Sequence, residues 1–527
     1  MKKYPSKQKR SITTILTKPI GIGLAAGTLL ATSVHAADGT WNSDANGNWE
    51  SGETAPWLSG TVAEGADFTA DFSTIDLTAH RTITVTNPLT IGNIIFDDTS
   101  GTSQYFVGGS TLTLDTTSGT PTITTHTSAR LNGIVAGNDG LVKEGTGTLE
   151  MRGANTYTGT TTINAGRLQL FTPTALNGDI VMGGGELWIN SNVTISLSDN
   201  ISGTGGQIVQ GNGSSVLSLL GNNTASNNFL KLDGTLMVGT GTNNGIGSGT
   251  FEMRGGQTMT NDNSARTFNN ALKIKGGIIL GADQGASSGL GDLTFTDTNN
   301  VIIGSDTEIT VNNDTTVTFN NSWGGGARTL TKSGAGNLVF NGDITSNLTS
   351  DLTINGGKLV LNGDQSAYLG ETIVNNSATL GGSGDMGGSV ILNDGGALAP
   401  GNSIGTFSGT DVTWNGGGEM QFELSNLDSS SDLLALSGAL TKGTAGDFTF
   451  NFLGTGAADT TYTLATFSST GLTSGDLSYT GLTDGLSGSF SVDGDSIEFV
   501  VIPEPSTFLL LCAGILAAFP CVRNRRK

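Results

Sequence analysis

The sequence predicts an all-β fold whose short strands wind into an elongated solenoid around one thin, continuous core. Glycine accounts for 81 of 527 residues and charged residues for only 13%, so apolar side chains are spread thinly among small polar ones. Apolar and polar residues alternate, as in Arg167-Leu168-Gln169-Leu170 and Leu293-Thr294-Phe295, and this period of two indicates half-buried strands. The chain also repeats itself, and stacked repeats bury such a core against their neighbours, which favours a solenoid over a sandwich or a barrel.

The internal repeat has two clear copies and one weaker echo. Leu141-Val-Lys143-Glu-Gly145-Thr-Gly147-Thr-Leu149 is similar to Leu330-Thr-Lys332-Ser-Gly334-Ala-Gly336-Asn-Leu338. Residues 163–170 are likewise similar to residues 354–361. Leu149-Glu-Met-Arg-Gly153 is echoed by Phe251-Glu-Met-Arg-Gly255. Gly, Asn and Asp separate the strand-like segments and mark turns.

The N-terminal segment 1–36 is typical of a secretory signal peptide. Residues 1–18 are basic, residues 20–34 are apolar or small, and Val34-His35-Ala36 has small residues where signal peptidase tests them. We therefore expect export by the Sec translocon and cleavage between Ala36 and Ala37. An uncleaved anchor is the alternative, but the apolar run is short for a membrane span.

Residues 37–410 are predicted to form the solenoid, with repeats clearest at 138–170 and 327–361. Alternation continues through residues 411–500, as in Phe448-Thr-Phe450-Asn-Phe452. We interpret this last region either as final coils or as a β-sandwich cap that covers the open end of the core.

The C-terminal segment 501–527 is predicted to be a sorting signal. It contains Pro503-Glu504-Pro505, an apolar run at 507–522 that predicts a short transmembrane helix, and the basic residues Arg523, Arg525, Arg526 and Lys527. This three-part order resembles the PEP-CTERM sorting signal. The resemblance implies an exosortase-type membrane enzyme as partner, a transient membrane anchor, and a final location at the cell surface or in the extracellular matrix. A plain C-terminal anchor is the alternative.

The body resembles a second family. Residues 144–168 are similar to the autotransporter-associated β-strand repeat, and residues 378–406 resemble the end of autotransporter passenger stalks. The resemblance implies a right-handed parallel β-helix. The chain departs from that family after residue 410, where a short apolar run and a basic tail stand in place of a membrane β-barrel, so we do not expect self-export.

The placement of charges and cysteines disfavours nucleic acid as a partner and excludes thiol chemistry in the body. Residues 37–505 hold 14 of the 24 basic residues and all 45 acidic ones, a net charge of −31, which disfavours nucleic acid as a partner. Cys512 and Cys521 both lie in the C-terminal apolar run, so the body has no thiol for disulfides, catalysis or zinc. We predict no cofactor and no specific metal site.

Four motifs suggest chemistry, and we assign none of them a catalytic role. Gly401-Asn-Ser403-Ile-Gly405 spells a nucleophile elbow, but no histidine follows it. Gly382-Ser-Gly-Asp-Met-Gly387 spells a dinucleotide loop without a following helix. His80 and His126 lie in Thr-rich alternating segments typical of solvent-facing strands. The basic residues Lys143, Arg152 and Arg167 occupy recurring repeat positions, which we interpret as surface decoration.

Trp41, Trp49 and Trp57 cluster near the start of the mature chain. A solenoid needs covered ends, so we expect these rings to cap the core. The alternative is that they stack on sugars.

These observations predict an exported, non-catalytic surface or matrix protein with a structural or adhesive role. A carbohydrate- or exopolysaccharide-binding module is the second hypothesis. The third is a polysaccharide lyase, which would need acidic side chains and a base gathered on one face.

Overall fold

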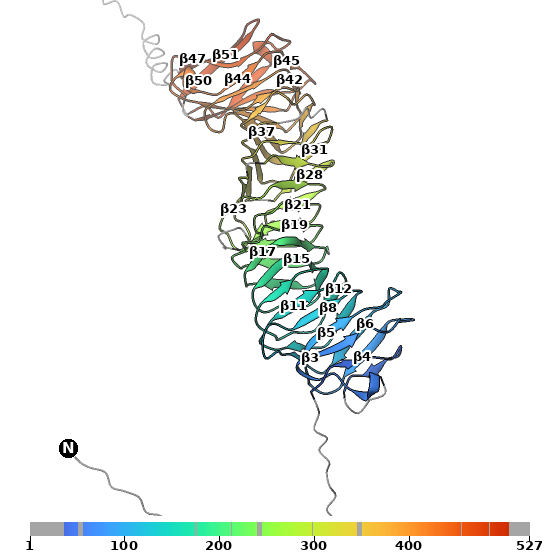
Figure 1. Cartoon of the computed structure of the whole chain (residues 1–527). Coiled ribbons are helices and arrows are strands. Elements are labelled where there is room, and N and C mark those ends of the chain that lie inside the picture. The colour runs from blue at the N-terminus through green and yellow to red at the C-terminus, as the bar shows by residue number, and fades with distance from the viewer. Residues whose placement is uncertain are drawn as a thin grey trace, which may run out of the picture. The chain divides into compact units, whose positions relative to one another are not determined.

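The computed structural model describes residues 36–504, with gaps at 51–55, 174–175, 212, 240–244, 298, 313, 345–349, 455 and 484 (Figure 1). The chain divides into two units, Met1–His35, which lies outside the described residues, and Ala36–Lys527. The described part of the second unit consists of β-strands and three short 3₁₀ helices, η1 (Leu58–Gly60), η2 (Asp428–Ser430) and η3 (Ser474–Asp476). The all-β prediction is therefore confirmed.

The described strands form four sheets. The first sheet contains β1 (Gly39–Thr40), β2 (Gly47–Asn48), β3 (Gly65–Phe72), β4 (Arg81–Val85), β5 (Leu89–Phe96), β6 (Tyr105–Gly109), β7 (Leu112–Leu114), β8 (Thr122–Thr125), β9 (Ala129–Leu131), β10 (Val135–Ala136), β11 (Leu141–Glu144), β12 (Thr148–Met151), β13 (Thr161–Ile163), β14 (Arg167–Leu170), β15 (Ile180–Ile189), β17 (Ile201–Gln210), β19 (Asn228–Lys231), β21 (Phe251–Met253), β24 (Leu272–Ile274), β27 (Val301–Ile303) and β30 (Trp323–Gly324). The second contains β16 (Thr194–Leu197), β18 (Val216–Leu219), β20 (Thr235–Val238), β22 (Gln257–Thr260), β25 (Ile278–Leu280), β28 (Thr307–Val311), β31 (Leu330–Ser333), β33 (Leu352–Ile354), β36 (Thr372–Val374), β39 (Val390–Leu392), β42 (Val412–Trp414), β45 (Ala439–Lys442) and β48 (Ser469–Thr470). The third contains β23 (Arg266–Phe268), β26 (Leu293–Phe295), β29 (Thr316–Phe319), β32 (Asn337–Phe340), β34 (Gly357–Leu361), β37 (Ala378–Gly382), β40 (Ala397–Pro400), β43 (Glu419–Leu424), β46 (Phe448–Gly454) and β49 (Leu477–Thr480). The fourth contains β35 (Asp364–Gln365), β38 (Asp385–Met386), β41 (Thr406–Gly409), β44 (Leu433–Leu436), β47 (Thr460–Thr466), β50 (Leu486–Val492) and β51 (Ser496–Pro503).

Strands of successive coils pair in parallel, which makes the described body a parallel β-solenoid. Each residue pairs with its equivalent one coil later, 19 residues on for Leu149 and Leu168 and 21 residues on for Leu338 and Leu359. Each of the two clear sequence repeats spans two paired coils, but on different sheets, because β11 to β14 belong to the first sheet whereas β31 and β33 belong to the second and β32 and β34 to the third. The right-handed sense that the family resemblance implies stays a prediction.

Alternation places the apolar side chains in one internal core. Leu168 and Leu170 of β14 are buried. Arg167, on the outer face of the same strand, reaches solvent, as predicted. In the middle of the stack, phenylalanines of equal register lie above one another, with ring centroids 4.8 Å apart for Phe268 and Phe295 and 5.0 Å apart for Phe295 and Phe319. Such aligned rings fix the register of one coil on the next.

The three N-terminal tryptophans close the first end of the core, in line with the capping interpretation. Trp41, Trp49 and Trp57 are at most 2% exposed and pack around Phe72, with ring centroids 5.0 to 5.6 Å from it. Trp49 Nε1 donates to Ala63 O, and Trp57 Nε1 donates to Trp49 O. A buried indole offers no face to a ligand, so the burial of these rings favours the cap over the sugar-stacking alternative.

The C-terminal region continues the coils rather than forming a separate sandwich. Strands β42 to β49 pair in parallel with the coils before them. Among the described strands of this region, β51 is antiparallel to both of its neighbours, β47 and β50. Phe490 of β50 and Phe499 of β51 pack against Phe452 of β46, with the rings of Phe452 and Phe499 4.5 Å apart, so this hairpin covers the core.

The predicted signal peptide and the predicted C-terminal sorting signal fall largely outside the described residues. The signal segment up to residue 35 and the predicted transmembrane helix at 507–522 are among the residues that the structure leaves undescribed. Within the described ranges, no helix combines the length and the apolar composition that a membrane crossing requires.

Candidate functional site

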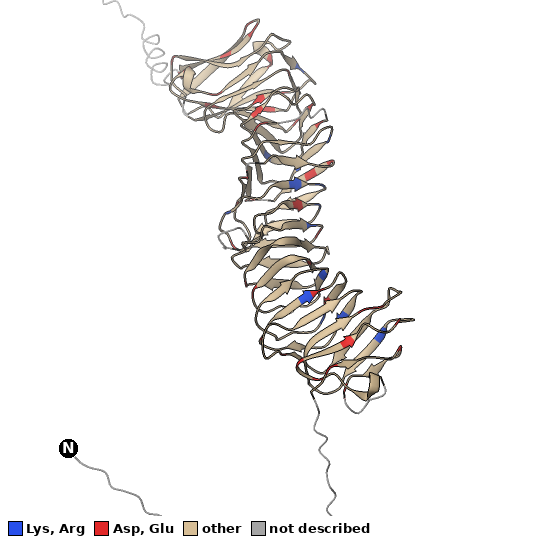
Figure 2. Ribbon diagram, viewed as in Figure 1, with Lys and Arg blue, Asp and Glu red and all other residues tan. Residues whose placement is uncertain are grey.

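Several cations of an otherwise acidic body lie on the outer surface of the first sheet, and Figure 2 colours Lys and Arg blue along the ribbon. Strands β9, β12, β14, β15, β17, β19, β21 and β24 pair in this order, so residues of equal register form rows across the coils. Three neighbouring rows contain six cationic side chains and three carboxylates, a net charge of +3. We call this surface the basic face. Its charged members are Arg130, Arg152, Arg167, Arg254, Lys273 and Lys275, with Glu150, Glu186 and Glu252.

This clustering is unusual for the chain. The body has 14 basic residues, of which Lys143, Lys231, Lys332 and Arg266 are buried. Six of the ten that reach the surface therefore lie on the basic face. The remaining body carries many more acids than bases, so the basic face is a local exception to a strongly negative field.

The first cluster on the basic face is built around Glu150. Its Oε2 lies 2.8 Å from Nε of both Arg130 and Arg152. The guanidinium of Arg152 lies 3.8 Å from the ring centroid of Phe171, and that of Arg130 lies 4.6 Å from the ring centroid of Phe106. Stacking on an aromatic ring holds the flat guanidinium in place while its edge stays open to solvent. The Arg152 side chain is 35% exposed, whereas that of Glu150 is 11% exposed.

A second cluster lies two strands further along. Arg167 stacks 3.8 Å above the ring of Trp188, and its Nε and Nη2 donate to Glu186 Oε2. Trp188 Nε1 donates to the same oxygen over 2.9 Å. All six tryptophans are described, and Trp188 is the one that is not buried.

The third cluster repeats the first. Glu252 accepts hydrogen bonds from Arg254 Nε at 2.6 Å and from Lys275 Nζ at 3.2 Å. Burial raises the pKa of the Glu252 carboxyl, but the hydrogen bonds from Arg254 and Lys275 outweigh it and hold this pKa below its usual range. Five strand pairings separate Glu150 from Glu252, which places the two Glu-Met-Arg-Gly segments roughly 24 Å apart along the stack.

A surface hollow borders the first cluster. Its lining includes Arg152, Phe171, Thr172, Asn190 and Ser191. Thr172 Oγ1 donates to Gly153 O, and Ser191 Oγ donates to Phe171 O, so both hydroxyls are held by the backbone of the coil below. An aromatic ring, a guanidinium and several hydroxyl and amide groups thus surround one concave surface, the combination that binds small polar ligands.

The recurring lysine of the repeat is buried and bonds backbone carbonyls, whereas the sequence predicted an exposed side chain. Lys143 is fully buried, and its Nζ donates to the carbonyl oxygens of Glu144 (2.7 Å), Gly145 (2.9 Å) and Ala165 (3.1 Å). Lys332 makes the equivalent bonds to Ser333, Gly334 and Gly356. The interpretation of Lys143 as surface decoration was therefore wrong. The lysine holds a turn together and ties it to the next coil.

We call a turn whose carbonyl oxygens bind a buried lysine a lysine corner. Two positive-φ glycines complete each such corner, and burial lowers the pKa of its lysine. Gly145 (φ 75°) and Gly166 (φ 60°) flank Lys143 in successive coils, and Gly334 (φ 76°) and Gly357 (φ 62°) stand in the same places near Lys332. A Cβ at Gly145 would lie 2.3 Å from Thr125 O, so only glycine fits there. Desolvation lowers the pKa of Lys143 and of Lys332 to about 8.

A third lysine corner escaped the sequence analysis. Lys231 Nζ donates to Gly234 O and Gly255 O, and burial lowers its pKa to about 7. Gly234 (φ 78°) and Gly256 (φ 68°) take the glycine places. The spacing from lysine to glycine is one residue longer here, which hid the similarity to the other two corners.

The predicted processing sites lie at the margins of the described body. Ala37 N donates to Glu64 O and Glu64 N donates to Ala37 O, so the expected first residue of the mature chain is paired. Pro503 is the last residue of β51, and Glu504 N donates to Gly485 O. Both are exposed. Pro505, Arg523, Arg525, Arg526 and Lys527 lie outside the described residues.

The enzyme-like motifs fall on turns of the solenoid. Ser403 sits between β40 and β41, and its Oγ donates to Glu423 Oε2 over 3.1 Å. His80 Nδ1 accepts from Gln104 N, and His126 follows β8 on an exposed turn, both in the N-terminal coils. The segment 382–387 crosses from β37 to β38, a strand rather than a helix. In the described ranges, no group of three or more His, Cys, Asp and Glu side chains is placed to hold a metal ion.

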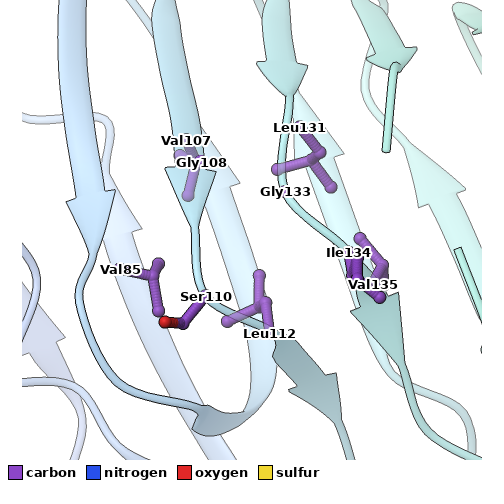
Figure 3. Close-up of a pocket in the computed structure, with 9 residues that line it drawn as sticks. All are labelled: Val85, Val107, Gly108, Ser110, Leu112, Leu131, Gly133, Ile134 and Val135. Carbon is purple, nitrogen blue, oxygen red and sulfur yellow. The ribbon is translucent and has the colours of Figure 1, made fainter. Parts of the chain in front are cut away.

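A small apolar hollow near the N-terminal end is a packing feature. Figure 3 shows its lining, which includes Val85, Val107, Leu112, Leu131 and Val135. It lies where β7 and β10 form a short side ladder on β5. The hydroxyl of Ser110 already donates to Thr86 O, so nothing in this hollow is arranged to recognise a polar ligand.

Comparison with known proteins supports the repeat assignment. Residues 141–170 and 330–361 match the model of the passenger-associated-transport-repeat family. The chain is similar to the adhesin BmaC autotransporter of Brucella suis biovar 1 (strain 1330), with 27% identity over 286 residues. The alignment covers 51% of this chain and only 7% of that protein.

Proposed function

We propose that this chain is an exported, non-catalytic surface protein with an adhesive role. The observation that carries the proposal is the similarity to an adhesin over half of the chain, in a body whose outer rows are held in fixed register by stacked coils. A solenoid of this kind presents a long regular surface, and such surfaces serve extended binding.

The contacts of the repeat residues fit this role. The recurring lysines and glycines hold turns together, and the outer arginines stack on rings and pair with carboxylates. Inner positions therefore set the stack, and outer positions are free to contact a partner.

A cell-adhesion assay tests the proposal. The full chain is displayed by a non-adherent bacterial host, and attachment to surfaces and to other cells is counted against the same host carrying Leu168→Asp. Leu168 is fully buried, so a charge there opens the stack. Attachment that depends on the intact chain supports the adhesive role, and equal attachment by both hosts contradicts it.

We further infer that the mature protein is produced by cleavage at both ends. Pro503 and Glu504 are exposed at the end of the last hairpin, just before the apolar run, and proline keeps this segment extended. Mass spectrometry of surface-extracted protein should find an N-terminus at Ala37 and a C-terminus near Pro503. Mature protein that still contains Cys512 and Arg526 would show an ordinary anchor instead.

A further inference from the structure

We propose that the basic face binds an extended, carboxylate-bearing polysaccharide, with the Glu150–Arg152 and Glu252–Arg254 clusters as two contact points and the hollow beside Arg152 as a sugar subsite. This inference rests on the proposed adhesive function and names its ligand.

Charge complementarity identifies the ligand as an anion. The basic face carries a net charge of +3 within a body of −31. A neutral or cationic partner would gain nothing from this surface and would be attracted elsewhere. Salt screens the surrounding acids beyond about 8 Å at physiological ionic strength, so a ligand lying on the face is governed by the cations it touches.

Charge density favours a polysaccharide over a nucleic acid. The six cations are spread over the strands from β9 to β24, and each cluster is already partly neutralised by a glutamate. Duplex DNA carries about one negative charge per 1.7 Å, far more than this face can offset. A uronate polymer has isolated carboxylates on a hydroxyl-rich chain, which fits sparse cations better.

The recurrence of the Glu-Met-Arg-Gly segment indicates a repeating ligand. Arg152 and Arg254 take the same place beside Glu150 and Glu252, roughly 24 Å apart along the stack. The methionines of both segments, Met151 and Met253, are buried in the core, so Glu and Arg of both segments lie on the outer face of the same sheet. Two similar Glu-Arg sites along one ladder, Arg152 with Arg130 and Arg254 with Lys275, suit a polymer with regularly spaced anionic units.

The hollow supplies the groups that a sugar ring needs. Arg152 lines the hollow and donates its Nε to Glu150, and a guanidinium has further N–H groups in a fork that matches a carboxylate. Phe171 fixes that guanidinium by stacking, the amide of Asn190 lies beside it, and the hydroxyl of Thr172, which donates to Gly153 O, can still accept a hydrogen bond. The arginine is therefore positioned before the ligand arrives, which lowers the entropic cost of binding.

Affinity measurements on the full chain test the proposal. Immobilised polygalacturonate is the anionic probe, neutral dextran is the uncharged probe, and duplex DNA is the competing polyanion, all at physiological salt. The site variant is Arg152→Gln with Arg254→Gln. The matched control is Arg328→Gln with Lys358→Gln, which removes two positive charges from positions off the basic face and so has the same net charge.

We expect wild type to bind polygalacturonate and not dextran. The site variant should lose about a hundredfold in affinity, since each charge-assisted hydrogen bond contributes about a factor of ten. The control should stay within about twofold of wild type. Glu150→Gln should strengthen binding several-fold, because it removes the carboxylate that competes for Arg130 and Arg152, and a purely structural role of Glu150 would not produce this gain.

Equal losses in the site variant and the control would overturn the proposal, as would DNA binding as tight as that of polygalacturonate. Cells that adhere through the displayed chain while the purified protein ignores polygalacturonate would refute this ligand and leave the adhesive function standing. Polygalacturonate binding that requires Arg152 and Arg254, in a chain that does not promote adhesion, would refute the adhesive function alone.

Discussion

Replacing the buried lysine of one corner, Lys332→Met, should change how stability depends on pH. Lys332 is fully buried, and its Nζ donates to Ser333 O at 2.9 Å, Gly334 O at 2.8 Å and Gly356 O at 3.0 Å. These carbonyls do not fully replace the water that a charged ammonium loses, so burial lowers the pKa of Lys332 to about 8.

The sign of the pH dependence follows from this lowered pKa. The unfolded lysine titrates near 10.5, so between about pH 8 and 10.5 the unfolded chain binds more protons than the folded one. The penalty for burying the charge is complete below pH 8 and disappears as the pH rises, and stability therefore increases with pH. One pKa unit corresponds to about 1.4 kcal/mol, which makes the contribution of Lys332 on the order of 3 kcal/mol.

Urea unfolding between about pH 7 and about pH 9.5 measures this effect. Higher pH is avoided because burial raises the pKa of Tyr157, and such a tyrosine costs stability once its unfolded form ionises near pH 10. The wild-type midpoint should rise across the range, because Lys143 and Lys231 titrate in the same sense. Lys332→Met should lose about a third of that rise, because Lys332 is one of the three buried lysines that produce it. Lys358→Met, which changes a partly exposed lysine on the third sheet, should keep all of it. An unchanged pH dependence in Lys332→Met would refute the reasoning.

Three further substitutions test the stack itself. Leu168→Asp should lower stability by several kcal/mol and open nearby coils to protease, because it buries an unpaired charge; a cleavage pattern like wild type would contradict this. Gly145→Ala should cost about 1 kcal/mol or more in urea unfolding, since its Cβ meets Thr125 O, whereas Gly494→Ala meets nothing within 4 Å and should be neutral. Trp49→Ala should cost about 3 to 5 kcal/mol and expose the N-terminal coils to hydrogen exchange without changing polygalacturonate affinity; loss of affinity with intact stability would restore it as a ligand contact.

The parts of the fold that depend on local pattern could be predicted from the sequence. Alternation predicted that Leu168 and Leu170 enter the core, and the matching segments at 141–170 and 330–361 indicated stacked coils, although the two segments lie on different sheets. The capping role of Trp41, Trp49 and Trp57 followed from the physical need to cover an open solenoid end. Each of these inferences uses only the neighbours that a residue has along the chain, or the general geometry of stacked coils.

The rows on the outer surface could not be predicted, because they depend on coil length. Paired residues are 18 positions apart for Thr379 and Ala397, 19 for Leu149 and Leu168, and 30 for Glu419 and Thr449. Insertions in the turns absorb the difference and leave no simple period to read. The juxtaposition of Arg130 with Glu150 therefore became visible only with the register.

The buried lysine was misinterpreted for a related reason. A recurring cation in a repeat is normally a solvated outer residue, since charged side chains are rarely buried without a partner. Lys143 breaks that rule because positive-φ glycines at Gly145 and Gly166 turn backbone carbonyls inward, where they accept the ammonium protons. The glycines were visible in the sequence as turn markers, but the direction of the carbonyls was not.

The buried lysine and the outer Glu-Arg pair act on different sides of each coil. Lys231 closes the turn inside the coil, and Glu252 and Arg254 of the next coil stand on the outer rows of the same sheet. Because the lysine corner and the core residues fix the register, an outer side chain can change without loosening the stack. A ligand-binding surface can therefore be assembled coil by coil from single outward substitutions, and the recurrence of Glu-Met-Arg-Gly at two coils is the pattern that such a surface leaves in the sequence.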